Sequence, residues 1–174
     1  MIRELKTTLQ EDLDDEMAEI IPLNQLQYKI EYLHSKNKDL VIVATNGCFD
    51  ILHIGHIRSL QKAKTLGDIL VVGINSDSSI KKIKGKDRPI NNENERAEIL
   101  AALSCVDLVS VFNDETAVKF LEIVKPNIYV KGQEYDLDNL PEAILVKKQG
   151  GKTIEIPMIP QASTTNIIER LKKN

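Results

Sequence analysis

The sequence predicts an α/β protein in which a doubly wound parallel sheet is flanked by helices. Short apolar runs alternate with segments of helical periodicity from residue 22 to the C-terminus, which is the pattern of strands joined by crossover helices. Polar segments follow the apolar runs at 46–56, 75–88, 132–138 and 157–165. Because ligands of such sheets bind outside the carboxyl ends of the strands, these segments are expected to form the site.

Length and composition favour one domain with an aliphatic core. The chain has 174 residues, of which 42% are hydrophobic and only 4% aromatic, and it contains no tryptophan. We expect residues 22–174 to form a Rossmann-like domain and residues 1–21 an acidic N-terminal extension. The net charge of −3 argues against nonspecific nucleic-acid binding, which usually needs a basic face.

The cysteines and apolar runs indicate a cytoplasmic protein that does not enter a membrane. Cys48 and Cys105 lie far apart and form no C-x-x-C, so a disulfide framework is not expected. No apolar stretch follows a basic start, so no signal peptide is expected. The longest apolar runs, 40–44 and 69–72, fall far short of the roughly 18 residues of a membrane span.

The first elements are an acidic segment and an amphipathic helix. Residues 11–16 are rich in Asp and Glu, which leaves a solvated helix, a tail and an oligomer contact all open. Pro22 then marks a break, and Leu23, Leu26, Ile30 and Leu33 recur at helical spacing with Asn24 as the expected N-cap.

The remaining elements alternate between strand and helix. Strands are expected where apolar residues run together, at 40–45, 68–74, 108–112, 128–131 and 153–156. Helices are expected where apolar residues recur every three or four positions, at 55–66, 93–103, 115–124 and 141–148 and from about 165 onward. Pro126 and Gly150-Gly151 follow helix ends, and the basic stretch 75–89 is expected to lack regular structure.

Two histidines lie at the first turn from strand to helix. His53 and His56 flank Gly55 directly after the strand at 40–45. Backbone N–H groups at a helix start attract anions, and two imidazoles add donors, so the pattern indicates a phosphate site. A zinc site is less favoured, because H-x-x-H without cysteines or a clear third ligand seldom binds zinc. One buried and one surface histidine with no function is the plainer alternative.

Residues 45–56, T-N-G-C-F-D-I-L-H-I-G-H, resemble the signature of the H-x-G-H nucleotidyltransferase superfamily, which is cytidylyltransferase-like. Further motifs follow in the family's order: G-I-N-S-D at 73–77, K-G-K-D-R-P at 84–89, E-R at 95–96, V-K-G at 130–132 and S-T-T-N-I-I at 163–168. The resemblance covers roughly Pro22 to the C-terminus, and it is greatest to the bacterial adenylyltransferases that act on heptose 1-phosphate.

The resemblance implies transfer of AMP from ATP to D-glycero-β-D-manno-heptose 1-phosphate, giving ADP-heptose and pyrophosphate for lipopolysaccharide assembly. It also implies Mg²⁺ as the companion of ATP, a homodimer, and a separate sugar kinase upstream, because no kinase sequence is present. No nucleic acid or membrane partner is expected.

The family's residues carry over to specific positions here. Catalysis would fall to His53, His56 and Lys84. Nucleotide binding would fall to the strand-end loops and the last helix start, namely Asn46, Gly47, Cys48, Phe49, His53, Gly55, His56, Lys131, Gly132, Ser163, Thr164 and Thr165. The substrate phosphate would contact Lys84, Lys86, Arg88 and Arg96, although a solvated loop and a structural salt bridge of Arg96 are the plainer alternatives. Asp50 is expected to orient its loop.

Two departures bear on the substrate. Gln133-Glu134-Tyr135 stands where heptose enzymes typically have glycine and aspartate, which leaves the exact sugar open. Glycerol-phosphate cytidylyltransferases carry an arginine shortly before the S-T-T triplet, and residues 157–160, P-M-I-P, contain none. A CTP-dependent enzyme acting on glycerol 3-phosphate is therefore the alternative, and a nucleotide-binding regulator without turnover is a further one.

Overall fold

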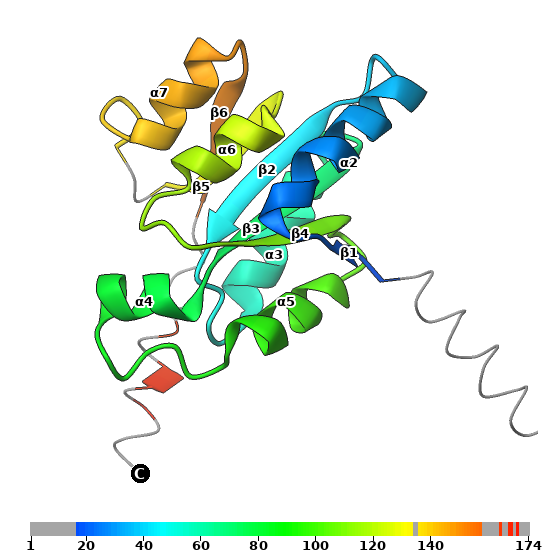
Figure 1. Ribbon diagram of the computed structural model, residues 1–174. Coiled ribbons are helices and arrows are strands. Elements are labelled where there is room, and N and C mark those ends of the chain that lie inside the picture. The colour runs from blue at the N-terminus through cyan, green and yellow to red at the C-terminus, as the bar shows by residue number, and fades with distance from the viewer. Residues whose placement is uncertain (1–16, 134–135, 158–163, 165–166, 169, 171–174) are drawn as a thin grey trace, which may run out of the picture.

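A six-stranded parallel sheet runs through the structure in the order β1-β4-β3-β2-β5-β6 (Figure 1). The computed structural model describes residues 17–133, 136–157, 164, 167, 168 and 170. The strands are β1 (Glu19–Ile20), β2 (Ile42–Gly47), β3 (Ile69–Asn75), β4 (Leu108–Phe112), β5 (Ile128–Gly132) and β6 (Lys152–Ile156). The helices are α2 (Leu23–Lys36), α3 (Ile54–Lys64), α4 (Asp77–Lys84), α5 (Glu93–Ala101), α6 (Val118–Val124) and α7 (Pro141–Lys148).

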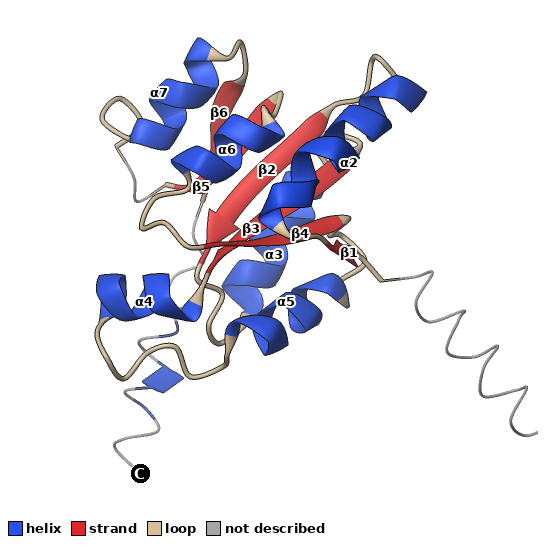
Figure 2. Cartoon of the chain, viewed as in Figure 1, coloured by secondary structure: helices blue, strands red, loops and turns tan. Residues whose placement is uncertain are grey.

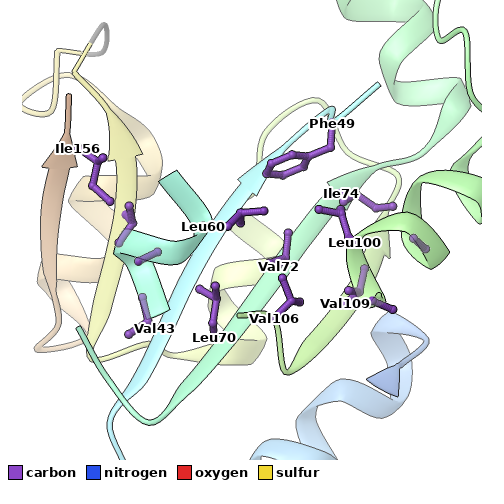
Figure 3. Close-up of a cluster of buried hydrophobic side chains, with 14 of the residues drawn as sticks. Val43, Phe49, Leu60, Leu70, Val72, Ile74, Leu100, Val106, Val109 and Ile156 are labelled. Atoms are coloured by element: carbon purple, nitrogen blue, oxygen red, sulfur yellow. The ribbon is translucent and has the colours of Figure 1, made fainter. Parts of the chain in front are cut away.

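Helices cover both faces of the sheet, as Figure 2 shows. On one face α3 and α5 pack through Leu60 and Leu100 onto Val72 and Val109, the cluster drawn in Figure 3. On the other face α2, α6 and α7 pack through residues such as Leu26, Phe120 and Val146. Burial of these apolar side chains supplies the main stabilising term of the fold.

The strand order reverses at β2. The chain moves outward from β2 through β3 to β4, and then returns to add β5 and β6 on the other side of β2. Adjacent crossovers therefore leave in opposite directions from β2 and β5, which opens a crevice at their carboxyl ends. The segment with the two histidines follows β2 and enters this crevice.

The predicted fold class is confirmed, and the expected strands and helices from residue 23 to 156 all occur with small shifts at their ends. The strand expected at 40–45 runs from Ile42 to Gly47, so Asn46 and Gly47 pair with Gly73 and Ile74 inside the sheet. The helix expected at 115–124 begins only at Val118. Of the last helix, residues 164, 167, 168 and 170 are described and are helical.

Three local expectations were wrong. The basic stretch 75–89 contains α4, which Ser76 caps by accepting a hydrogen bond from Ser79 N at 3.2 Å and which Ile80 fastens to the core. Asn24 lies inside α2, because Pro22 occupies the N-cap position and its carbonyl accepts from Gln25 N and Leu26 N.

The third wrong expectation concerns the acidic N-terminal extension, because part of it pairs with the sheet. Glu19 and Ile20 form the edge strand β1 beside β4. The neighbouring amide of Ile21 donates to Val109 O at 2.8 Å. A two-residue strand has no detectable periodicity, which is why the sequence did not reveal it. Among the described residues no helix combines the length and apolar character that a membrane span needs.

Candidate functional site

A cavity of about 440 Å³ lies at the carboxyl ends of the central strands. Eleven of the residues expected at the site line it: Asn46, Gly47, Cys48, Phe49, His53, Gly55, His56, Lys84, Lys131, Gly132 and Thr164. They come from the ends of β2 and β5, from the start of α3, from the end of α4 and from the C-terminal segment. Residues that are far apart in the chain thus meet at one place.

The end of β2 presents a polar amide at the cavity. Asn46 Oδ1 accepts hydrogen bonds from Tyr129 Oη at 2.5 Å and from Lys131 Nζ at 3.0 Å. With its oxygen occupied by two donors on β5, the amide offers its NH₂ group to a ligand oxygen. Lys131 is 9% exposed and lies in the same wall, so this part of the crevice is a set of donors.

The next turn depends on Gly47. Phe49 adopts the left-handed conformation with a φ of 45°, which is costly for an aromatic residue. Its ring turns back over Gly47, where an added Cβ would lie 3.1 Å from the ring. Figure 3 shows Phe49 at the end of the core cluster nearest this turn. The loop therefore brings its backbone to the cavity while its aromatic side chain completes the core.

The two imidazoles stack at the start of α3. His53 is the N-cap residue, and its Nδ1 accepts a hydrogen bond from His56 N at 3.4 Å. The ring centroids of His53 and His56 are 3.7 Å apart, with planes inclined by 19°. Since Nδ1 of His53 is an acceptor, its proton sits on Nε2, which is a donor.

Both imidazoles are biased toward the neutral form. Burial lowers the pKa of His53. Burial, then the neighbouring His53 and Lys84, lower the pKa of His56 to about 4. His56 Nδ1 is buried and has no hydrogen-bond partner among the described residues. The imidazole pair lies at the N-terminus of α3, where backbone N–H groups favour an anion.

Lys84 approaches the histidines from α4. It is the last residue of that helix, and Gly85 follows with a φ of 96°. Lys84 lines the cavity, whereas the exposed Lys86 does not. The structure thus distinguishes two of the residues that were expected to contact the substrate phosphate.

Arg88 is held away from the cavity by Asp50. Its Nε donates to Asp50 Oδ2 at 2.5 Å, and the carboxylate is 1% exposed. The other oxygen, Oδ1, accepts from Ile90 N at 2.7 Å and from Asn91 N at 3.0 Å. Asp50 therefore anchors the loop after β2 to the segment before α5, and Arg88 serves that anchor in this structure.

Arg96 does not reach the cavity, contrary to the expected phosphate contact. It is 1% exposed, and its guanidinium donates to Cys48 O at 2.7 Å, Asp77 Oδ1 at 2.8 Å and Asn91 O at 3.1 Å. The salt-bridge alternative is what the geometry shows. A basic residue at a helix start is compatible with either role, and only the fold places a carbonyl and a carboxylate beside it.

Thr164, near the C-terminus, lines the cavity beside the loop after β2. Thr164 Oγ1 donates to Ile51 O at 3.2 Å, which ties this residue to that loop. Ser163 and Thr165, also expected to bind nucleotide, lie outside the described residues.

Several lining residues were not anticipated from the sequence. Seven of them lie outside the segments expected to form the site: Thr45, Ser59, Leu60, Glu115, Leu140, Glu142 and Ile156. Asn75, Ile83 and Pro157 lie within those segments, although they were not named as individual site residues. Glu142 gave no signal, since a glutamate after a proline is ordinary at the start of a helix.

The described residues contain no group of three or more His, Cys, Asp or Glu side chains arranged to hold a metal ion. The donors of the cavity wall suit phosphate oxygens instead. A metal ion that accompanies a triphosphate is held mainly by phosphate oxygens and water, and it needs no protein cage.

The chain is similar to proteins of one family over most of its length. A family model described as cytidylyltransferase-like matches residues 44–170. Bifunctional protein HldE of Citrifermentans bemidjiense is 44% identical over 157 residues, which is 90% of this chain and 32% of that protein. Bifunctional protein HldE of Helicobacter pylori is 46% identical over 161 residues, 92% of this chain and 33% of that protein. The chain spans about a third of the length of these relatives.

Two solved structures share the fold. A lipopolysaccharide core biosynthesis protein from Thermoplasma volcanium superposes with a TM-score of 0.58 and 34% identity, covering 69% of this chain and 97% of that one. Pantoate-β-alanine ligase from Francisella tularensis, complexed with β,γ ATP and β-alanine, gives a TM-score of 0.60 at 18% identity, covering 90% of this chain and 80% of that one. At that identity the second likeness concerns the fold alone.

Proposed function

Because this chain belongs to the cytidylyltransferase-like family of nucleotidyltransferases, we propose that it transfers AMP from ATP to D-glycero-β-D-manno-heptose 1-phosphate. The products are ADP-heptose and pyrophosphate. The bifunctional HldE relatives and the lipopolysaccharide core biosynthesis protein support a sugar phosphate as the acceptor. One observation carries the proposal, namely the stacked pair of neutral imidazoles at the N-terminus of α3 with Lys84 on the same cavity.

The reaction needs positioning more than it needs a protein nucleophile. An oxygen of the sugar phosphate attacks the α-phosphorus of ATP, a new P–O bond forms, and the bond to pyrophosphate breaks. Charge builds on the equatorial oxygens of the α-phosphate and on the leaving oxygen. Donors fixed in advance around those oxygens stabilise the transition state more than the ground state.

The residues of the cavity divide this work by position. His53 and His56, together with the first N–H groups of α3, hold the triphosphate at the helix N-terminus. Asn46 directs its NH₂ group to a phosphate oxygen, because Tyr129 and Lys131 occupy its carbonyl. Lys84 comes from the end of α4 and neutralises charge on the acceptor phosphate or on the leaving pyrophosphate. Gly85, in a conformation that favours glycine, permits α4 to end there.

Mg²⁺ bound to ATP would shield the negative charge of the triphosphate. A sugar kinase must supply the 1-phosphate acceptor. Both ATP and a sugar phosphate are cytoplasmic metabolites, so we propose that the reaction takes place in the cytoplasm. We further propose a homodimer, as the family resemblance implies.

The test is pyrophosphate release by the purified protein with ATP, Mg²⁺ and heptose 1-phosphate. Matched reactions with CTP and with glycerol 3-phosphate test the alternative substrate pair. Release with CTP and glycerol 3-phosphate, and none with ATP and the heptose, would replace the proposal by that alternative. Tight binding of ATP with no turnover on either acceptor would point to a regulatory protein.

A further inference from the structure

The cavity is lined by residues from both helical layers of the fold. The imidazoles and the start of α3 line it, and α3 belongs to the layer that packs on one face of the sheet. Glu142 lines the same cavity from α7, which belongs to the layer on the opposite face. A substrate whose phosphates lie against the histidines can therefore extend its uncharged part toward the glutamate.

Glu142 is an unusual residue for a cavity wall because it is a carboxylate that is only 5% exposed. Its Oε1 accepts a hydrogen bond from Ala117 N at 3.0 Å, at the start of α6. Its Oε2 is not one of the enclosed polar atoms that lack a partner, so this oxygen is open to the cavity. A carboxylate has about four lone-pair positions, so one backbone donor leaves most of its capacity unused. The unused positions face the cavity, where water or a ligand can donate hydrogen bonds to them.

The ligand groups that could donate hydrogen bonds to Glu142 can be limited by their chemistry. A phosphate oxygen has no proton to donate and would be repelled by the carboxylate. An apolar group would leave the charge uncompensated. Neighbouring hydroxyl groups of a carbohydrate fit, because each O–H donates to an oxygen that backbone contact already holds in place.

We propose that Glu142 is a substrate-binding residue that accepts hydrogen bonds from carbohydrate hydroxyl groups. This inference rests on the proposed function, and it names the group that recognises the sugar. Hydroxyls of this kind belong to the acceptor sugar and to the ribose of the nucleotide. The experiment below separates the two sources.

The experiment compares the wild-type protein with Glu142→Gln in steady-state kinetics. Glutamine keeps an oxygen for Ala117 N, so α6 stays in place, but it loses the charge and one acceptor. The KM for the substrate that carries the hydroxyls is expected to rise about tenfold or more, whereas the KM for the other substrate stays within about twofold. A rise for heptose 1-phosphate assigns Glu142 to the acceptor, and a rise for ATP assigns it to the ribose.

A substrate series makes the result independent of how the variant folds. The series uses heptose 1-phosphates that each lack one hydroxyl, together with 2′-deoxy-ATP and 3′-deoxy-ATP. With the wild-type protein, one of these compounds is expected to show a kcat/KM about tenfold below that of the full substrate. With Glu142→Gln, the same compound and the full substrate are expected to have the same kcat/KM. The inference is overturned if both KM values of the variant match the wild type, or if no single hydroxyl matters to the wild-type protein.

The matched control is Glu122→Gln, which removes an exposed carboxylate from α6 outside the cavity and should leave both KM values unchanged. Failure of the inference differs from failure of the proposed function. If the wild-type protein turns over heptose 1-phosphate and Glu142→Gln does so equally well, only the inference fails. If the wild-type protein neither turns over nor binds any sugar phosphate in calorimetry, both fail.

Discussion

The free energy of unfolding is expected to decrease as the pH falls from about 6.5 to about 4, and replacing His56 by glutamine should make this decrease smaller. The pKa of His56 is lowered from 6.5 to about 4 in the folded protein, mainly by burial. The unfolded chain therefore binds a proton before the folded chain does. The contribution of His56 to the free energy of unfolding is fully present above its pKa in the unfolded chain. It decreases as the pH falls toward its pKa in the folded protein.

The size of the effect follows from the two pKa values. At 1.36 kcal/mol for each pH unit between them, full protonation of the unfolded state corresponds to about 3 kcal/mol. Water in the open cavity screens part of this penalty, so the expected contribution is about 1–3 kcal/mol. This is a large share of the stability of a small domain.

The measurement is urea denaturation of the wild type and of His56→Gln at about pH 7 and about pH 4.5. The wild-type protein should lose about 1–3 kcal/mol more than the variant between these conditions. Equal losses in both proteins would show that His56 is not held neutral by its surroundings, and the reasoning about the imidazole pair would fail with it.

The same argument predicts proton uptake when a polyphosphate binds. An anion beside His56 favours its charged form and raises its pKa toward the ordinary value. Binding of inorganic tripolyphosphate near pH 5.5, which lies between about 4 and 6.5, should then take up close to one proton in the wild type and less in His56→Gln. Calorimetry in two buffers of different ionisation enthalpy measures this number.

Three further predictions concern single residues. His56→Ala should lower kcat about 10²- to 10³-fold with the fold intact by circular dichroism, whereas His34→Ala, on α2 outside the cavity, should retain activity in the pyrophosphate assay. Lys84→Ala should lower kcat/KM for the acceptor at least about tenfold, and more than Lys86→Ala does, since only Lys84 lines the cavity; similar losses would contradict that placement. Asp50→Asn should cost about 3 kcal/mol in urea denaturation, because it leaves the guanidinium of Arg88 without its buried partner; a cost below about 1 kcal/mol would mean that the loop is held by other contacts.

The strands and helices that carry the site could be predicted because the site residues directly follow segments with a clear apolar periodicity. Polar residues that follow apolar strands must emerge at one edge of a parallel sheet, and the histidine segment after β2 does so. Asn46, Lys84 and Lys131, which were named from the motif order, line the cavity. Helix α4 was missed because its eight residues bury few apolar side chains, so that its capping by Ser76 and its packing through Ile80 decide its formation.

The amino-acid sequence by itself determined most of the strands and helices, the strand-to-helix turn with its two histidines, and the family to which the chain belongs. These properties rest on residue type and spacing, which are local quantities. The roles of Arg88, Arg96 and Glu142 were decided only by the tertiary structure. A charged side chain binds a ligand or serves the fold according to which partners lie within about 3 Å, and those partners come from distant parts of the chain. Arg88 binds Asp50 and therefore does not line the cavity. Arg96 likewise binds Cys48 O and Asp77. Glu142 accepts a hydrogen bond from Ala117 N, which keeps it in the cavity wall.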